Sequence, residues 1–220
     1  MTKYKLVCFD VDGTLVDNVE FSWELLHDHF NIDKAKRKQA MEKYFKGEIG
    51  YKQWADHDIA LWKAKGVCKQ DFIDALKTIK LMKGALETIQ TLKAKGFKLA
   101  IISGSIDIFL EQVLPNYKEL FDDIFFSYAI FDKDEKLQSM KVTEFDMIKK
   151  ADALKLISQR ENIPLKQCVH IGDHHNDVEI AKIAGLSIAF NCKDEGLRKA
   201  ATLEIKEKDL RLILPFILKK

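Results

Sequence analysis

The chain of 220 residues has little net charge, few cysteines and no long apolar run. Its 36 lysine and arginine residues nearly balance 34 aspartate and glutamate residues, and the net charge of +2 gives no indication of nucleic-acid binding. No apolar run reaches the length of a membrane span, and the chain turns acidic by Asp10, before a signal peptide could form. These absences predict a cytoplasmic protein with no nucleic-acid or membrane partner.

The spacing of the cysteines argues against two of their common uses. Cys8, Cys68, Cys168 and Cys192 form no CxxC pair. Cys8 and Cys168 also lie within apolar runs that are typical of buried strands. We therefore expect reduced residues of the core and not disulfides or metal ligands.

The pattern of apolar residues changes twice along the chain. Residues 4–9 predict a buried strand, whereas residues 19–79 repeat apolar positions at helical spacing and predict three or four helices with almost no strand. From residue 83 helices and strands alternate. The predicted strands are 97–103, 123–127, 167–173, 186–191 and 202–205, with a hairpin at 128–140 and helices at 83–95, 106–114, 149–162, 176–184 and 209–218.

This alternation predicts an α/β fold, in which a Rossmann-like, doubly wound parallel sheet carries helices on both faces. The helical insert after the first strand is too long to be an ordinary loop. We therefore expect two domains, an α/β core made of residues 1–16 and 81–220 and a helical cap made of residues 17–80.

Polar residues follow three of the predicted strands. Asp10 and Asp12 end the first, Ser103 ends the strand at 97–103, and Asp173 ends the strand at 167–173. Ligands of open α/β sheets bind at the carboxyl ends of the strands. Alternation places Asp10 and Asp12 on one side, where their charges repel unless a cation stands between them. Mg²⁺ would meet that need, and Asp173 could supply a further oxygen.

The same edge of the sheet suits phosphate chemistry. The Ser103 hydroxyl and nearby backbone N–H groups at a helix N-terminus would bind an anion. Lys149 or Lys150, at the start of a helix, could neutralise phosphate oxygens. Asp10 could attack phosphorus to form an aspartyl phosphate, with Asp12 as general acid and base.

Four stretches together resemble the haloacid dehalogenase superfamily of phosphohydrolases. They are "DVDGTLV", "IISGS", a lysine before an amphipathic helix, and "IGDHHNDVEIA", in that order. The chain is most similar to the phosphoserine-phosphatase-like branch, whose helical cap is inserted between the first two motifs. The resemblance implies the haloacid-dehalogenase-like fold and a Mg²⁺ cofactor.

The resemblance also implies a role for each matching residue. Asp10 would be the nucleophile and a metal ligand, and Asp12 the general acid and base with its backbone carbonyl on the metal. Ser103 and the Gly104 N–H would bind the phosphoryl group. Lys150, in preference to Lys149, would be the lysine of the third motif.

The last motif supplies the remaining implied roles. Asp173 would be a metal ligand, and Asp177 would hold the water molecules of the metal. Asn176 would lie beside the phosphate. Gly13 would allow the sharp turn that leaves the first strand.

The cap departs from the phosphoserine phosphatase pattern. The position of its substrate-binding glutamate falls on Val19, with Glu20 next to it, and that of its arginine falls near Asp58, while the only arginine of the insert, Arg37, lies elsewhere on the pattern. Five aromatic residues accompany them: Trp23, Phe45, Tyr51, Trp54 and Trp62. Glu20, Tyr51 and Asp58 are therefore candidate substrate-binding residues of an aromatic, acidic pocket. Such a pocket favours a leaving group that is cationic or flat.

The sequence also predicts where four of the histidines lie. His174 and His175 are adjacent in a loop, so their side chains are expected to point apart and not to share a ligand, although His175 could face the substrate. His27 and His29 do not share a helix face and are expected at the surface.

These observations predict a Mg²⁺-dependent hydrolase of a small phosphorylated metabolite that works through an aspartyl phosphate. One alternative is a phosphotransferase or mutase of the same superfamily. Another is a non-enzymatic phospho-acceptor module of the receiver type. The sequence leaves open whether the protein is a monomer or a homodimer.

Overall fold

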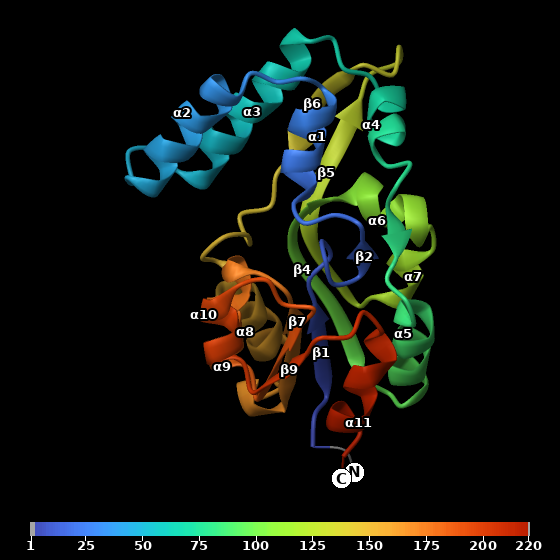
Figure 1. Ribbon diagram of the computed structural model, residues 1–220. Helices are drawn as coiled ribbons and strands as arrows, with labels where there is room; N and C mark the ends of the chain where they lie inside the picture. Colours follow the sequence, from blue (N-terminus) through green and yellow to red (C-terminus); the bar gives the residue numbers. More distant parts are fainter. Residues whose placement is uncertain (1–2, 220) are drawn as a thin grey trace.

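The computed structural model describes residues 3–219, and a seven-stranded sheet forms its centre (Figure 1). The strand order is β6-β5-β4-β1-β7-β8-β9, and every neighbouring pair is parallel except β5 and β6. The strands are β1 (Leu6–Phe9), β4 (Lys98–Ile106), β5 (Asp123–Phe131), β6 (Leu137–Lys141), β7 (Cys168–Gly172), β8 (Leu186–Phe190) and β9 (Leu203–Ile205). The sheet confirms the predicted doubly wound α/β fold.

Strand β1 shows why the sheet is buried on both faces. Its four residues are all buried, so the strand appears in the sequence as a continuous apolar run. Leu6 and Cys8 pack with residues of α8 and α9, whereas Val7 and Phe9 pack with residues of α5 and α11. The helices of the core are α5 (Ala85–Ala94), α6 (Asp107–Val113), α7 (Tyr117–Leu120), α8 (Lys150–Arg160), α9 (Val178–Ile183), α10 (Glu195–Ala200) and α11 (Leu214–Ile217).

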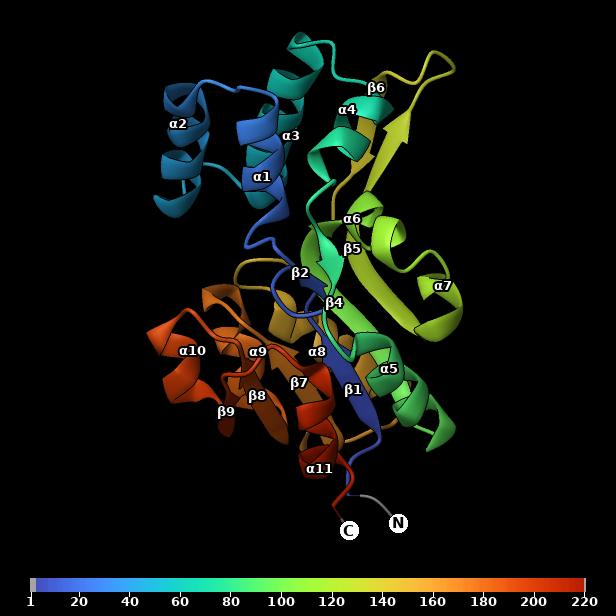
Figure 2. The ribbon, with the colours of Figure 1, turned by 45° about the vertical axis from the view of Figure 1, so that its right-hand side comes forward.

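Four helices lie together beyond one end of the sheet, beside the β5–β6 hairpin (Figures 1 and 2). They are α1 (Ser22–His29), α2 (Lys34–Phe45), α3 (Tyr51–Ala64) and α4 (Lys69–Ala75), in agreement with the three or four helices expected. The strands β2 (Val16–Asp17) and β3 (Lys80–Leu81), which the sequence pattern did not predict, pair where the chain leaves the sheet and returns. The division into a core and a cap at 17–80 stays a prediction.

Several elements differ from those expected. Strand β5 runs unbroken into the hairpin, so one strand serves both the sheet and the hairpin. Helices α7 and α10 were not predicted, because four and six residues are too few to show a helical period. The segments expected as single helices at 176–184 and 209–218 begin with the 3-10 turns η2 (His175–Asp177) and η3 (Leu210–Ile213), and η1 (Leu165–Gln167) precedes β7.

All four cysteines are free, and three of them are buried as expected. Cys68 is only half-buried, since it caps the start of α4 and does not belong to the core. Within residues 3–219, none of the helices combines the length and the apolar character that crossing a membrane requires.

Candidate active site

The turn after β1 brings the first two candidate residues to the edge of the sheet. The Asp10 N–H donates to the Ile171 carbonyl at 2.9 Å, which continues the pairing with β7 for one residue. Gly13 then adopts a φ of +70°, and a Cβ at this position would lie 2.1 Å from Asp173 Oδ2. The turn therefore needs glycine both for its backbone angle and for the space that the Asp173 carboxylate occupies.

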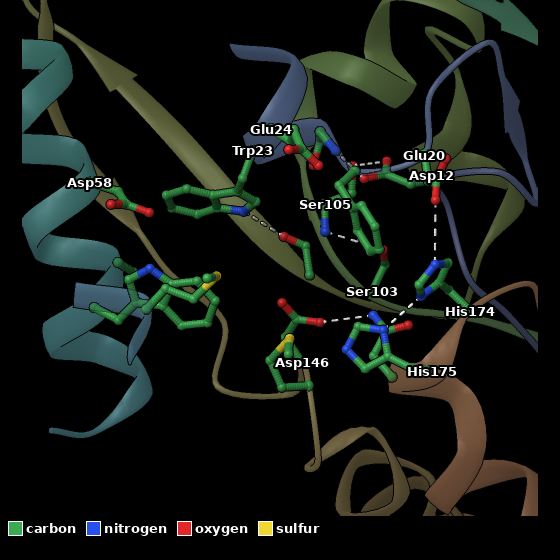
Figure 3. Close-up of a pocket in the computed structure, with 18 of the residues that line it drawn as sticks. Asp12, Glu20, Trp23, Glu24, Asp58, Ser103, Ser105, Asp146, His174 and His175 are labelled. Carbon is green, nitrogen blue, oxygen red and sulfur yellow. Dashed lines mark hydrogen bonds and ion pairs between the residues drawn. The ribbon is translucent and has the colours of Figure 1, made fainter. Parts of the chain in front are cut away.

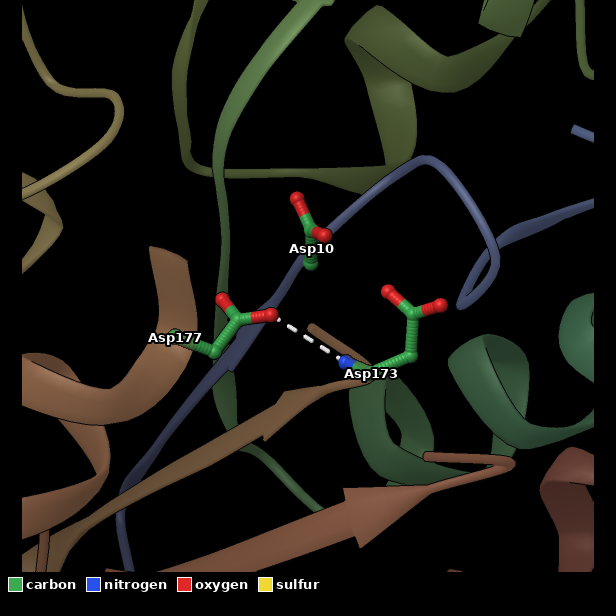
Figure 4. A group of neighbouring side chains, drawn as sticks. All are labelled: Asp10, Asp173 and Asp177. Carbon is green, nitrogen blue, oxygen red and sulfur yellow. Dashed lines mark hydrogen bonds between the residues drawn. The ribbon is translucent and has the colours of Figure 1, made fainter. Parts of the chain in front are cut away.

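Three buried carboxylates meet at this edge (Figure 4). One oxygen from each of Asp10, Asp173 and Asp177 lies within 4.8 Å of the others. The ammonium group of Lys150 is fully buried between two of them, with Nζ 2.9 Å from Asp10 Oδ1 and 2.8 Å from Asp177 Oδ1. Asp177 Oδ2 accepts hydrogen bonds from the N–H groups of Asp173 and His174. The cluster thus contains three acids and one cation.

Burial and neighbouring charges set the protonation of this cluster. Burial raises the pKa of Asp10 to about 7, against the opposing effect of Lys150. Burial, with the charges of Asp10 and Asp177, raises the pKa of Asp173 well above its ordinary value. Burial also opposes the ionisation of Asp177, but Lys150 and His170 outweigh it and lower the pKa of Asp177. For Lys150 burial is likewise outweighed, because Asp10 and Asp177 raise its pKa.

Asp173 provides the test of whether a cation fits here. Both of its carboxylate oxygens are buried, and within residues 3–219 neither accepts a hydrogen bond. Its nearest cation is Lys193, with Nζ 3.6 Å from Oδ2. A buried carboxylate that accepts no hydrogen bond is costly, and hard divalent cations prefer carboxylate oxygens. The cluster is therefore suited to hold a divalent metal ion.

Asp12 has different partners from Asp10. Its Oδ2 accepts a hydrogen bond from the Ser22 N–H at 2.6 Å, and its Oδ1 accepts one from Ser105 Oγ at 2.7 Å. The Asp12 carboxylate does not belong to the three-acid cluster, and these two donors satisfy its oxygens. Burial raises the pKa of Asp12 above its ordinary value, although these hydrogen bonds oppose the shift.

Ser103 lies at the same edge but not at a helix N-terminus as expected. Strand β4 continues to Ile106 with an irregularity after Ile102, and α6 begins only at Asp107. The Ser103 hydroxyl is buried and accepts a hydrogen bond from the Ser105 N–H at 3.1 Å. Backbone N–H groups near Ser103 therefore belong to the end of a strand.

The structure separates the two candidate lysines clearly. Lys150 is the first residue of α8 and points into the acidic cluster. Lys149 precedes the helix, is exposed, and pairs with Glu144 at 2.8 Å. The geometry favours Lys150 as the lysine of the third motif.

A cavity of about 420 Å³ opens above these residues, between the sheet edge and helices α1 to α3 (Figure 3). Nine residues of the predicted site line it: Asp10, Asp12, Glu20, Tyr51, Asp58, Ser103, Gly104, Asp173 and Asn176. Lys150 and Asp177 lie behind this surface and are fully buried. The fold therefore brings together residues that were selected from the sequence. Their roles remain predictions.

Asp146 is a residue of the cavity wall that the sequence analysis missed. Its carboxylate accepts hydrogen bonds from the Tyr51 hydroxyl at 2.7 Å and from Asn176 Nδ2 at 3.1 Å. A Cβ on Gly104 would lie 2.0 Å from Asp146 Oδ2. Asp146 joins α3 to the sheet edge, and its segment "TEFDM" carries no motif that could have indicated it.

Arg37 reaches the cavity although its place in the sequence pattern suggested otherwise. It lies on α2 and lines the cavity with Lys34 and Lys38 of the same helix. Its Nη1 lies 3.3 Å from Glu24 Oε1. The fold thus brings three cations to the wall opposite the sheet.

The expected aromatic, acidic pocket also contains these cations, and two of its candidate acids, Glu20 and Asp58, have basic partners. Glu20 Oε1 lies 3.4 Å from His174 Nε2, and Glu20 Oε2 lies 3.9 Å from Lys193 Nζ. Asp58 Oδ2 lies 3.1 Å from Nε2 of His27. Both acids line the cavity, and each has two basic side chains within 4 Å.

His27 is not at the surface as expected. It is buried on α1, and its Nδ1 accepts a hydrogen bond from Trp62 Nε1 at 3.1 Å, which leaves the proton on the nitrogen that faces Asp58. His29 is exposed, as expected. The histidines at 174 and 175 do not point apart, since their Nδ1 atoms lie 2.6 Å from each other.

The chain is similar to known proteins along nearly its whole length. The haloacid dehalogenase-like hydrolase family matches residues 4–185. A phosphoserine phosphatase from Methanocaldococcus jannaschii is 34% identical over 220 residues, covering 98% of each chain. One from Lactococcus lactis is 28% identical, covering 96% of this chain and 94% of its own.

A solved structure agrees with these relatives. It is described as a phospho-aspartyl intermediate analogue of phosphoserine phosphatase, and its TM-score is 0.74 at 31% identity, covering 97% of this chain and 99% of its own. The chain belongs to the haloacid dehalogenase-like hydrolases and is an enzyme of their phosphatase branch.

Proposed function

We propose that this phosphatase is a Mg²⁺-dependent phosphomonoester hydrolase that acts on a small phosphorylated metabolite and transfers the phosphoryl group to Asp10. The observation that carries the proposal is the position of the Asp10 carboxylate. It lies at the floor of the cavity, held by Lys150 on one side, and on the other side lies Asp173, whose carboxylate accepts no hydrogen bond within residues 3–219. Aspartate is an established nucleophile for phosphoryl transfer.

The acidic cluster supports the metal part of the proposal. Asp10 and Asp173 would hold Mg²⁺ directly, with the backbone carbonyl of Asp12, and Asp177 would hold its water molecules. The ion would supply positive charge that lets the phosphate approach a carboxylate of the same sign.

Each step of the reaction then has a residue in place. Asp10 attacks phosphorus, and the bond from phosphorus to the oxygen of the alcohol breaks. Asp12 gives its proton to that oxygen. Asp12 next accepts a proton from the water that attacks phosphorus, so phosphate leaves and the Asp10 carboxylate is regenerated. The raised pKa of Asp12, caused mainly by burial, supports its initial protonation.

The residues around Asp10 would stabilise the charge on the transferring group. Ser103, the Gly104 N–H and Asn176 would donate hydrogen bonds to its oxygens, and Lys150 would add a full positive charge. Preorganised donors and cations of this kind supply most of the rate in phosphoryl transfer.

The relatives named phosphoserine phosphatase make phosphoserine one candidate substrate. In that case Glu20, Tyr51 and Asp58 would contact the amino acid part. A phosphotransferase of the same family would pass the phosphoryl group to a second alcohol, and product analysis with an added acceptor separates it from a hydrolase.

The test is phosphate release from a panel of small phosphomonoesters, with Mg²⁺ and with chelator. Wild type is compared with Asp10→Asn and Asp12→Asn. We expect release that needs Mg²⁺, is abolished in Asp10→Asn and is slowed in both steps in Asp12→Asn. Undiminished turnover by Asp10→Asn would reject Asp10 as the nucleophile.

A further inference from the structure

Two aromatic walls face the cavity from different helices. Trp23 on α1 extends towards the sheet edge, where its Nε1 donates to the Gly104 carbonyl at 3.0 Å (Figure 3). Trp62 packs against Trp23 from behind, with ring centroids 5.0 Å apart. The indole of Trp23 is therefore held in one orientation, beside the groups that would bind phosphate.

The second wall belongs to α2 and α3. Trp54 packs against Tyr44 at 5.0 Å and against Tyr51 and Phe45 at 6.0 Å between ring centroids. Among the ring contacts of residues 3–219, none joins Trp54 to Trp23, although both line the same cavity. Both walls border the cavity, and the part of it between Trp23 and Trp54, here called the slot, could receive a flat group.

Trp54 also lacks a polar partner. Its Nε1 is buried, and no acceptor for it exists among the residues that the structure describes. Indole nitrogen is a donor only, so a buried indole N–H needs an oxygen or nitrogen that accepts its hydrogen bond. Trp54 itself lines the cavity, so a ligand that reorders the side chains around this nitrogen could offer it an acceptor.

Most N–H donors of the Arg37 guanidinium group have no acceptor within residues 3–219. A guanidinium group carries five N–H donors, and only the Nη1 contact with Glu24 is made within residues 3–219. The Arg37 side chain is 21% exposed, compared with 53% for Glu24, so the arginine is the more enclosed of the two. With Lys34 and Lys38 beside it, this part of the wall favours an anionic group.

We infer that the enzyme prefers a phosphomonoester of an aromatic alcohol that carries an anionic substituent. The ring would lie in the slot between Trp23 and Trp54, and the anion would accept hydrogen bonds from Trp54 Nε1 and Arg37. This inference rests on the proposed function and names its substrate class. Serine has no ring, so phosphoserine would leave the slot empty.

Four substrates separate the two features. O-phosphotyrosine has a ring with a carboxylate and an ammonium group, phenyl phosphate has the ring alone, phosphoserine has the same carboxylate and ammonium group without a ring, and ethyl phosphate has none of these. Aryl phosphates react faster for chemical reasons. The quantity compared is therefore the ratio of kcat/KM between wild type and variant on each substrate, in which that difference cancels.

Trp54→Leu should lower kcat/KM by about tenfold on the two ring-bearing substrates and by less than about twofold on the other two. Trp54→Phe keeps a ring but no N–H, so it should retain activity on phenyl phosphate and lose activity on O-phosphotyrosine. Arg37→Gln should lower the activity on O-phosphotyrosine about tenfold relative to phenyl phosphate. Lys36→Gln, at an exposed lysine of α2 that does not line the cavity, is the matched control.

The outcomes distinguish this inference from the proposed function. If Trp54→Leu lowers activity equally on all four substrates, the slot does not receive a ring, and the inference is wrong while the hydrolase stands. If wild type hydrolyses none of them, the proposed function fails on this panel. Binding to the slot is then measured by quenching of tryptophan fluorescence. The inference is wrong unless O-phosphotyrosine binds more tightly than phosphoserine. Circular dichroism confirms that each variant is folded.

Discussion

Replacing Lys150 by methionine should change stability and activity much more than the same replacement at the neighbouring Lys149. The ammonium group is fully buried and lies 2.9 Å from Asp10 Oδ1 and 2.8 Å from Asp177 Oδ1. Without it, oxygens of three buried carboxylates lie within 4.8 Å of one another, and Lys193 is the lysine that remains beside them. Removing one partner of a buried ion pair costs about 3–5 kcal/mol, so we expect the free energy of unfolding to fall by about that much.

Lys149→Met is the matched control. Its side chain is 49% exposed and pairs with Glu144, which is 65% exposed. An exposed pair of this kind contributes about 0–1 kcal/mol. Two adjacent lysines, changed in the same way, should therefore differ several-fold in their effect on stability.

Urea unfolding followed by circular dichroism measures both variants, with and without Mg²⁺. Mg²⁺ should stabilise Lys150→Met, because a cation bound to the folded state replaces part of the missing positive charge. The value of kcat should fall by about 10²–10³ in Lys150→Met, the range for removing one preorganised donor, and stay near wild type in Lys149→Met. Equal effects of the two substitutions on stability and activity would refute this assignment of the charges.

Three further predictions concern the surroundings of the site. Gly13→Ala places a Cβ 2.1 Å from Asp173 Oδ2, so activity should fall by about 100-fold and the response to Mg²⁺ should weaken in a titration. His27→Ala leaves the buried Trp62 N–H without its acceptor and removes one of the two imidazoles beside Asp58, so it should cost about 3 kcal/mol in urea unfolding. Burial opposes ionisation of Asp17, but the hydrogen bond from Lys208 outweighs it and lowers the pKa of Asp17. The stability that Asp17 contributes is therefore present above the ordinary carboxyl range and is lost as the pH falls through its lowered pKa. At neutral pH Asp17→Asn should lower the free energy of unfolding by less than about 1 kcal/mol, because water screens the pair, and should therefore lower Tm slightly. At strongly acid pH it should not lower Tm. A Tm difference that grows on acidification would contradict the last prediction.

The residues at the strand ends were predictable because their positions depend on local pattern. Asp10, Ser103 and Asp173 each follow an apolar run, and parallel strands bring their carboxyl ends to one edge. The cap helices were predictable from the helical spacing of the apolar residues between 19 and 79. A helix of only four or six residues is too short to show a local pattern, and α7 and α10 were missed for that reason.

The cap side of the cavity was predicted less well, since it depends on how separate helices pack. Arg37 reaches the cavity only because α2 packs against α3, and no spacing within the insert indicates that contact. His27 is buried because Trp62 and Asp58 come to it from α3, a helix far along the chain. Asp146 lies in a loop whose position depends on Tyr51 and on the 3-10 turn η2.

The most direct measurement is the capture of a phosphorylated enzyme. Wild type, Asp12→Asn and Asp10→Asn are mixed with substrate and Mg²⁺, quenched in acid within the first turnover, and digested for mass spectrometry. The account predicts one phosphoryl group on the peptide that contains Asp10, more of it in Asp12→Asn, and none in Asp10→Asn. A phosphoryl group on another residue, or rapid turnover with no phosphorylated peptide at any time, would contradict the account.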